Sequence, residues 1–235
     1  MDAFYTSRSN ISDAHLRIIG EEHHHLSRVS RTKIGEEIYV ADGEGMMYRA
    51  RVASIDASAS NCEIVEKLDA FHEPKRKIIL AQAVLKNPGK MDWIVEKATE
   101  LGVSEIIPME TERTLTTHAK KERLQHLALA AMKQSLRCRL PLIHETHRMD
   151  EILMRWEGAD VVMLHESAPL GNRLLEIVHR NSPAKALVLF VGPEGGFSED
   201  EVAIAQQHHA LLVSLGTRRL RSETAAIAAL AILMD

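Results

Sequence analysis

The apolar stretch Ala186-Leu-Val-Leu-Phe-Val191 runs directly into Gly192-Pro-Glu-Gly-Gly-Phe197. Glycines allow positive φ angles and let a ligand approach the backbone closely, so this loop favours ligand binding over a plain tight turn. Ser198 then fits the N-cap position of a helix, and the acids up to Glu201 suit the first turn of that helix. A strand, a glycine-rich loop and a helix in succession are typical of α/β proteins.

The same alternation continues on both sides of this stretch. Further strands are predicted at Ile78–Val84, Glu105–Pro108, Val161–Leu164 and Leu211–Leu215. Helices are predicted around Met91–Leu101 and Lys121–Leu136 and near residues 170–180, 199–209 and 223–234. This order predicts a mainly parallel sheet that is covered by helices on both faces.

The first 72 residues have a different pattern, of short β-like segments. Strands are predicted at Glu37–Ala41, Met46–Ile55 and Cys62–Glu66, with a turn at Asp42-Gly43. In the second of these strands Tyr48, Ala50 and Val52 alternate with arginines, which is typical of a half-buried strand. We therefore predict a small barrel over residues 1–72, a linker at residues 71–74, and an α/β domain over residues 73–235.

The overall composition excludes several classes of protein. The chain has 235 residues, of which 45% are hydrophobic and 26% charged, so disordered and fibrous classes are set aside. The longest uncharged apolar stretch, Thr224–Met234, is too short to cross a bilayer, and no secretory signal segment is visible. Cys62 and Cys138 form no disulfide or zinc pattern. We expect a cytoplasmic protein with no membrane partner.

Charge is unevenly distributed along the chain. Lys and Arg number 29 and Asp and Glu 33, which gives a net charge of −4, and residues 1–72 alone account for 8 − 12 = −4. Residues 113–139 instead carry 7 − 1 = +6, and Arg28, Arg31 and Lys33 form a second basic segment. Affinity for nucleic acid follows local charge rather than the total, so these segments favour an anionic polymer as partner.

Two more predicted strands end in polar loops. The strand ending at Leu215 is followed by Gly216, by arginines at positions 218, 219 and 221, and by Ser222-Glu223. The arginines suit a phosphate or carboxylate, whereas Ser222 and Glu223 also suit the start of a helix. The strand ending at Leu164 is followed by His165 and Glu166. In an open α/β sheet these loops would meet at one edge.

Several familiar sites are absent from the sequence. It contains no GxGxxG fingerprint, no phosphate-binding GxxxxGK[ST] loop, no HExxH and no GxSxG. The consecutive histidines 23–25 cannot all face one ion on a helix or a strand, so no metal is expected there.

Taken together, the motifs resemble those of the RsmE family of the SPOUT superfamily, the bacterial small-subunit ribosomal RNA methyltransferases that modify N3 of a uridine. The matching stretches, in order along nearly the whole chain, are Glu22–Val29, Gly35-Glu36, Asp42-Gly43, Lys90–Val103, Thr111–Arg113, Lys133–Ser135, Val191–Phe197, Leu215-Gly216 and Leu220–Ala225. One departure is Leu136, which stands where the family usually has glycine.

The resemblance implies a PUA-like β-barrel that helps to grip RNA and an α/β domain with a deep trefoil knot. It implies a homodimer that binds S-adenosylmethionine, with no metal, and acts on 16S ribosomal RNA of the small ribosomal subunit. The residues implied to hold the methyl donor are Leu164, His165, Val191, Gly192, Pro193, Glu194, Gly195, Gly196, Leu215, Gly216 and Leu220. Those assigned to RNA are Arg28, Arg31, Lys33, Lys90, Arg113, Lys133, Arg137, Arg139 and Arg218.

The implied reaction is methyl transfer to N3 of uracil, which must first lose its proton. Arg221 is the main candidate to stabilise the developing anion or to place the base. Glu223 is predicted either to orient that arginine or to take the proton, with Glu194 as an alternative. N3 lies on the pairing edge, so the uridine must be unpaired or extruded.

Two other functions remain open. A non-catalytic RNA-binding protein with a PUA-like barrel would not need the glycine-rich loop. A tRNA methyltransferase of the same superfamily, which often acts on a ribose hydroxyl, would need no deprotonation of N3. A nicotinamide-dependent dehydrogenase is disfavoured because its glycine fingerprint is missing.

Overall fold

The computed structural model describes residues 3–116, 119–169, 174 and 186–233. The chain divides into two compact units. Unit 1 comprises Met1–Glu73 and Leu129–Leu140, and unit 2 comprises Pro74–Ala128 and Pro141–Asp235. The excursion of Leu129–Leu140 into unit 1 is a feature that the sequence patterns do not predict.

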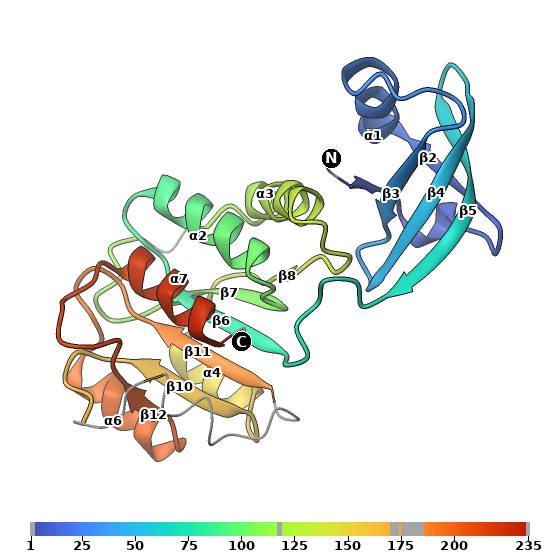
Figure 1. The fold of residues 1–235 in the computed structure, drawn as a ribbon. Coiled ribbons are helices and arrows are strands. Elements are labelled where there is room, and N and C mark those ends of the chain that lie inside the picture. The colour runs from blue at the N-terminus through green and yellow to red at the C-terminus, as the bar shows by residue number, and fades with distance from the viewer. Residues whose placement is uncertain (1–2, 117–118, 170–173, 175–185, 234–235) are drawn as a thin grey trace. The chain divides into compact units, whose positions relative to one another are not determined.

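Unit 1 is built on a curled sheet with the strand order β1-β3-β4-β5-β2 (Figure 1). The strands are β1 (Phe4–Tyr5), β2 (His15–Ile19), β3 (Glu37–Ala41), β4 (Met46–Ile55) and β5 (Ala59–Asp69). The pairing of β1 with β3 is parallel and the other pairings are antiparallel. Two register shifts between β4 and β5 increase the local twist, which accounts for the curl.

The alternating pattern of the sequence sets the two faces of this sheet. Tyr48, Ala50 and Val52 are at most 1% exposed and pack in one cluster with β2 and β3 residues, whereas Arg49 and Arg51 pair with Glu37 near the surface. The prediction of β3 and β4 is therefore confirmed. The strand predicted at Cys62–Glu66 is longer in the structure, and β1 and β2 were missed because they are short or flanked by polar residues.

The segment Leu129–Leu140 packs on the start of β4. Met132 and Cys138 lie in one buried cluster with Ala3, Ala41 and Met47, which explains why this segment belongs to unit 1. Leu136 ends the turn with a φ of +56°, a conformation that glycine adopts without strain. Both thiols are free and buried, and burial raises the pKa of the Cys62 thiol to about 11.

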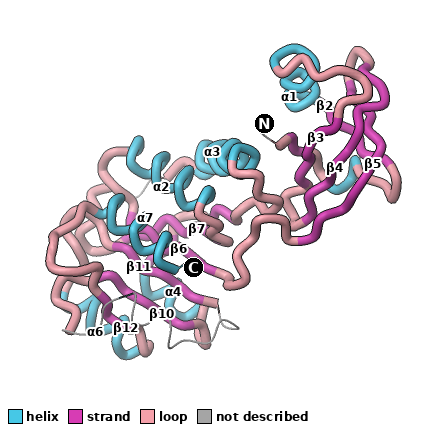
Figure 2. Tube along the Cα trace, in the orientation of Figure 1, coloured by secondary structure: helices cyan, strands magenta, loops and turns pink. Residues whose placement is uncertain are grey.

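Unit 2 contains a second sheet, whose strands are the magenta segments around β6, β10 and β11 in Figure 2. Its order is β12-β10-β11-β6-β7-β8, with β9 also pairing with β7, and every pairing is parallel. Its strands are β6 (Ile78–Ala83), β7 (Glu105–Glu110), β8 (Leu142–Ile143), β9 (His147–Arg148), β10 (Asp160–Leu164), β11 (Leu187–Val191) and β12 (Leu211–Val213). The mainly parallel α/β sheet predicted from the alternating pattern is confirmed.

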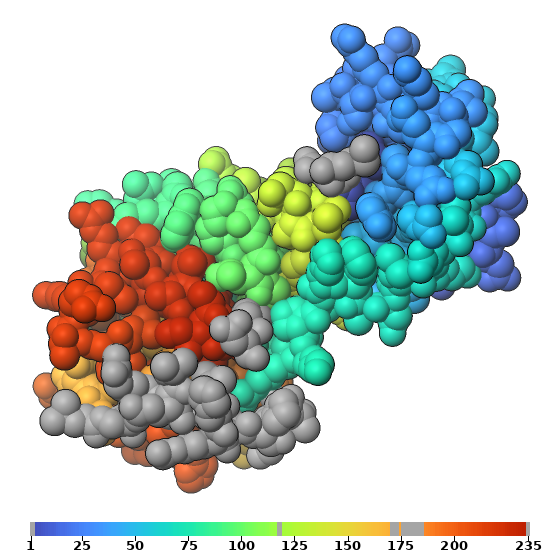
Figure 3. Space-filling model, in the orientation of Figure 1, coloured from blue at the N-terminus to red at the C-terminus, as the bar shows by residue number. Residues whose placement is uncertain are grey.

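Helices cover both faces of this sheet. On one face α4 (Met149–Arg155) and α6 (Glu199–Gln207) share a buried cluster with Ile79, Ala81 and Phe190. On the other, α2 (Pro88–Glu100) and α7 (Ser222–Leu233) lie side by side (Figure 3). Gly102, with a φ of +97°, follows α2 and suits the end of that helix.

The remaining helices are α1 (Gly20–His24), which continues into a π-helical turn at His25–Val29, and α3 (Lys121–Gln134). The sequence patterns did not predict α1, α4, β8 or β9. The helix predicted near residues 170–180 lies outside the described residues apart from Leu174. Among the described helices, none combines the length and the apolar character needed to cross a membrane.

Candidate functional site

A cavity of about 590 Å³ opens at the carboxyl ends of β10, β11 and β12 in unit 2. Because these strands are parallel neighbours, the loops that follow them leave the same edge of the sheet. The cavity is within the size range of small-molecule sites. All eleven residues predicted to hold the methyl donor line it: Leu164, His165, Val191, Gly192, Pro193, Glu194, Gly195, Gly196, Leu215, Gly216 and Leu220.

The loop of residues 192–197, here called the glycine loop, is held by contacts along its length. Gly196 donates its N–H to Pro193 O at 3.0 Å, which closes a turn. Ser222 Oγ donates to Gly192 O at 2.6 Å, and Arg113 Nη1 donates to Gly195 O at 2.9 Å. The loop is therefore fixed at three points, by its own turn and by two other segments of the chain.

Two of its glycines are required by geometry. A Cβ at Gly192 would lie 3.2 Å from the ring of Phe197, which is buried beneath the loop. Gly196 has a φ of +69°, in the region that L side chains rarely adopt. The inference from sequence that these glycines serve the backbone of the loop agrees with this geometry.

Glu201 links the base of the glycine loop to the segment after β7. Its carboxylate accepts the N–H of Ser198 at 2.8 Å and the N–H of Glu112 at 2.8 Å, while Ser198 Oγ accepts the N–H of Glu201. The predicted N-cap at Ser198 is thus confirmed as a capping box. Glu201 also places the neighbouring Arg113 over Gly195.

Lys90 and Glu223 form an ion pair beside the cavity. Lys90 Nζ, from the first turn of α2, lies 3.0 Å from Glu223 Oε1 in the first turn of α7. Burial alone would raise the pKa of the Glu223 carboxyl, but its own backbone N–H and the Lys90 ammonium outweigh burial and hold that pKa below its usual value. Glu223 Oε2 is buried, and no side-chain or backbone donor among the described residues reaches it.

Arg218, Arg219 and Arg221 all line the cavity from the segment after β12, and all are exposed. Arg219 lies 3.8 Å from Glu166, but both side chains are more than 70% exposed, so this pair is weak. Arg221 lines the cavity immediately before α7 begins at Ser222. The predicted catalytic arginine therefore stands at the same cavity as the predicted donor loop.

The residues predicted to bind RNA are divided between unit 1 and unit 2. In unit 2, Lys90, Arg113 and Arg218 are at or next to the cavity, although Arg113 is engaged with the glycine loop. The other predicted residues belong to unit 1, where Arg28, Arg31, Lys33 and Arg139 are exposed and Lys133 pairs with Glu22.

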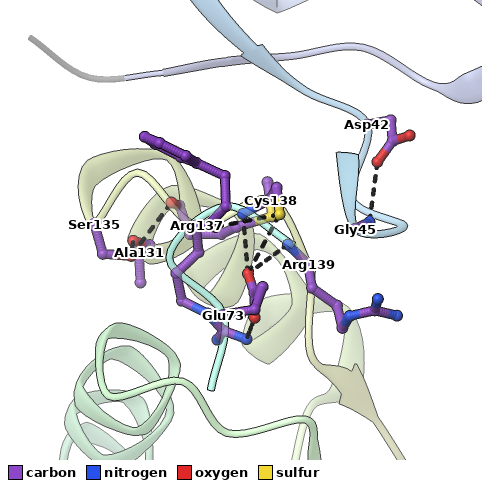
Figure 4. A network of polar contacts seen from close by, with 10 residues as sticks. Asp42, Gly45, Glu73, Ala131, Ser135, Arg137, Cys138 and Arg139 are labelled. Atoms are coloured by element: carbon purple, nitrogen blue, oxygen red, sulfur yellow. Dashed lines mark hydrogen bonds and ion pairs between the residues drawn. The ribbon is translucent and has the colours of Figure 1, made fainter. Parts of the chain in front are cut away.

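Arg137, one of the residues predicted to bind RNA, is buried in the structure. It is 2% exposed, and its Nη2 donates to Glu73 Oε2 at 2.7 Å (Figure 4). The other carboxylate oxygen of Glu73 accepts the N–H groups of Cys138 and Arg139 at 3.0 and 2.9 Å. Arg137 thus neutralises a buried carboxylate inside unit 1 and has no surface with which to meet a phosphate.

The histidine run takes three different environments. His23 is buried and its Nδ1 contacts Ser60 Oγ at 2.9 Å, His24 is exposed, and the ring of His25 lies near Phe4. Within the described part of the chain, no group of three or more His, Cys, Asp or Glu side chains is placed to hold a metal ion.

Sequence reasoning missed Gln82 and the second role of Ser222. Gln82 lies in β6, is fully buried, and donates to Ser222 Oγ at 3.0 Å. The signal was present, since Gln82 is the polar residue of the otherwise apolar stretch Ile78–Val84. Ser222 was assigned to a helix start, whereas its hydroxyl holds the glycine loop.

Comparison with known proteins gives a consistent result. The sequence model of a family described as "RNA methyltransferase domain" matches residues 72–234. The chain is 33% identical, over the full length of both proteins, to ribosomal RNA small subunit methyltransferase E of Aquifex aeolicus. It is 30% identical to the Bacillus subtilis protein of the same name, covering 91% of this chain and 87% of that one.

A solved structure provides the corresponding comparison of folds. The ribosomal RNA small subunit methyltransferase E from Neisseria gonorrhoeae, bound to S-adenosyl methionine, superposes with a TM-score of 0.84 at 30% identity. The match covers 98% of this chain and 95% of that one. The putative methyltransferase Lpg2936 from Legionella pneumophila, also with bound cofactor SAM, gives a TM-score of 0.78 at 26% identity and covers 98% and 96%.

Proposed function

The chain belongs to the ribosomal RNA small subunit methyltransferase E family, and from that premise we propose that it transfers a methyl group from S-adenosylmethionine to N3 of a uridine in 16S ribosomal RNA. The observation that carries the proposal is the cavity at the carboxyl ends of β10, β11 and β12. There the glycine loop and the arginine-bearing segment 215–221 face the same space.

The residues of this cavity fit S-adenosylmethionine. Gly192–Gly196 line the cavity, and a Cβ at Gly196 would meet nothing within 4 Å, so the backbone of this part of the loop is open to a ligand. Backbone groups of Gly192–Gly196 and Leu215–Leu220 would hold the adenine and methionine ends, with Leu164 and His165 alongside. The bound donor supplies a methyl group already activated on a sulfonium.

Lys90 in the first turn of α2 and Arg221, which directly precedes α7, act on the uracil. N3 gives up its proton to solvent, and its electron pair forms a bond to the methyl carbon as the bond from that carbon to sulfur breaks, which leaves the donor as a neutral thioether. The charge that develops on the uracil needs positive neighbours, which Arg221 and Lys90 provide at the cavity wall. Alignment of donor and acceptor supplies the rest, and can be worth about 7–11 kcal/mol.

Glu223 orients these cations rather than acting as a strong base. Its pKa is held below the ordinary value by its backbone N–H and by Lys90, against the effect of burial, and a carboxylate of low pKa accepts a proton weakly. Its Oε1 instead holds the ammonium of Lys90 at the cavity wall, where the uracil would bind. The uridine must be extruded from its stack to reach this position.

The finer architecture belongs to the same proposal. We include in it the trefoil knot that the family resemblance implies, and the contact of Ser222 with Gly192, which joins the chain after β12 to the loop after β11, is compatible with such a knot. We take residues 1–72 as a PUA-like half of the protein that binds RNA through Arg28, Arg31 and Lys33, together with Arg139 from the segment Leu129–Leu140. We take residues 73–235 as the methyltransferase domain of a cytoplasmic homodimer, with partly exposed Ala228 and Ile232 on α7 available to a second copy.

The test uses small ribosomal subunits from cells that lack this protein. Incubation with the purified protein and S-adenosylmethionine, followed by mass mapping of 16S RNA fragments, is expected to give one 3-methyluridine. The Arg221→Ala variant is the matched control and should give none. Methylation of tRNA instead of 16S RNA would support a related tRNA enzyme, and failure to bind the donor in calorimetry would support a non-catalytic RNA-binding protein. Either result would overturn the proposal.

A further inference from the structure

Gln82 is a polar residue inside an apolar strand of the unit 2 sheet. It is fully buried, it pairs in register with Val191 of β11, and its neighbours along β6 are apolar. A buried amide in such a place needs an explanation, because an apolar side chain of the same size would fit the core without a desolvation penalty.

The hydrogen bonds of Gln82 have a direction that the chemistry fixes. Gly192 O only accepts, so the hydroxyl of Ser222 donates its proton to it at 2.6 Å. Ser222 Oγ must then accept from Gln82, and the group that donates at 3.0 Å is the amide nitrogen Nε2. The second proton of Nε2 goes to Ala83 O at 3.0 Å, which sets the orientation of the amide.

This relay joins the two sides of the cavity. Gly192 begins the glycine loop, and Ser222 lies between Arg221 and Glu223 at the start of α7. A displacement of the amide of Gln82 would therefore change the position of the glycine loop relative to Arg221 and Glu223. The amide adds little to the sheet itself, because its oxygen, Gln82 Oε1, is buried and makes no hydrogen bond within the described residues.

We propose that Gln82 is a positioning residue, which acts through Ser222 to fix the distance between the donor-binding glycine loop and Arg221 and Glu223. The proposal rests on the proposed methyl transfer. Its structural part, that Gln82 rigidifies the glycine loop through Ser222, stands on the contacts alone.

The first experiment is hydrogen exchange on the ligand-free protein. Gln82→Met keeps the size of the side chain and removes both donors, and Ser222→Ala removes the hydroxyl. Both variants should speed exchange of the Gly196 amide by about tenfold, the equivalent of one lost hydrogen bond away from water. Thr99→Val, which removes another fully buried hydroxyl in α2 that donates to Val95 O at 2.7 Å, should leave that amide unchanged.

The second experiment measures donor affinity and turnover. Gln82→Met and Ser222→Ala should each lower kcat about tenfold and weaken S-adenosylmethionine binding several-fold, with KM for RNA unchanged, and the double variant should lose no more than either single one. Ser222→Thr should restore most of the rate, because it retains the hydroxyl. The thermal midpoint of Gln82→Met should be equal to or above that of the wild type, since the unpaired Oε1 is removed.

The outcomes are separable. Wild-type exchange and turnover in Gln82→Met, or losses that add in the double variant, would overturn the relay even if the wild type methylates 16S RNA. A lowered thermal midpoint of Gln82→Met with a kcat equal to that of Thr99→Val would mean that Gln82 serves only the packing of the core. That result would also overturn the proposal. If the wild type fails to methylate, the exchange experiment still decides the structural part.

Discussion

The glycine loop and the segment Leu215–Arg221 face the same cavity, but they are built in different ways. The glycine loop is fixed at three points, by Ser222 at Gly192, by its own turn at Gly196, and by Arg113 at Gly195. The segment after β12 exposes every residue from Thr217 to Arg221, and its ion pair to Glu166 joins two side chains that are mostly in solvent.

The difference indicates a division of labour. A loop that is already fixed loses little conformational entropy when a small ligand binds, so the donor side is preorganised. The backbone of Leu215–Leu220 is proposed to hold the donor as well, but the exposed arginine side chains of this segment keep their hydration and rotamer freedom until a polyanion arrives. These side chains therefore form the acceptor side, which the substrate completes. Substitutions in the two loops should therefore separate donor binding from RNA-dependent steps.

The largest expected effect is that of Arg221→Ala. It should lower kcat about 100- to 1000-fold, as removal of one group that stabilises a developing charge does, while the Kd for S-adenosylmethionine stays within about twofold. Single-turnover methylation and calorimetry measure the two quantities. Arg221→Lys keeps the charge without the planar fork and should recover part of the rate.

Two results with Arg221→Ala would contradict the division of roles between the glycine loop and the segment after β12. Turnover at the wild-type rate would remove Arg221 from the chemistry. A large loss of donor affinity would place Arg221 on the donor side, and the division between the two loops would not hold.

Glu223→Gln should have the next largest effect, a loss of about tenfold in kcat, because the ion pair with Lys90 is replaced by a weaker hydrogen bond from the ammonium to a neutral amide oxygen. The pKa of Glu223 is lowered, so its carboxylate is ionised throughout the neutral range and its contribution is lost only in acid, as pH falls through that lowered pKa. The rate profiles of wild type and variant should therefore run parallel above about pH 5, since an ordinary Glu titrates near 4.3. A limb near pH 6–7 that disappears in the variant would instead identify Glu223 as the base.

Gly196→Ala tests the glycine loop, with a smaller expected effect that appears in the affinity for S-adenosylmethionine. Gly196 has a φ of +69°, and a Cβ added there would meet nothing within 4 Å, so the cost is backbone strain of about 1 kcal/mol, or roughly fivefold in donor affinity. Gly158→Ala is the matched control, because Gly158 has a φ of +92°, equally open surroundings, and no part in the cavity. Both variants should lower the thermal midpoint by about 2–4 °C, but only Gly196→Ala should weaken binding in calorimetry.

Much of the fold follows from local patterns, and the exceptions have physical reasons. The apolar runs at Ile78–Val84 and Ala186–Val191 predicted strands, since a strand buried on both faces needs no alternation. By contrast α4, which is only seven residues long, gave too few turns for a helical period. The entry of Leu129–Leu140 into unit 1 depends on the packing of Met132 and Cys138 against distant Met47, which no local pattern records.

The candidate site was predicted unevenly for the same reason. Glycines and arginines after strands mark a ligand edge in any parallel sheet, so the cavity residues were found from chain order. A basic residue, however, gives the same signal whether it is exposed, like Arg218, or paired with an internal carboxylate, like Arg137 with Glu73. Partner choice depends on tertiary contacts, and that is why charge alone overestimated the RNA surface.

The smallest expected effect is that of Arg218→Ala. An exposed arginine that meets a phosphate contributes mainly by releasing counterions, so its loss should weaken RNA binding only a few-fold and reduce the slope of log K against log salt by about 1. Donor affinity should be unchanged, because the glycine loop makes its contacts elsewhere. Arg155→Ala, in the last turn of α4 before the amino end of β10, is the matched control and should leave the salt slope as it is in the wild type. Filter binding at several salt concentrations measures both slopes. An unchanged slope for Arg218→Ala together with weaker donor binding would mean that this exposed side chain serves the donor, as the backbone of its segment is proposed to do. The contrast between the two loops would then be one of rigidity alone.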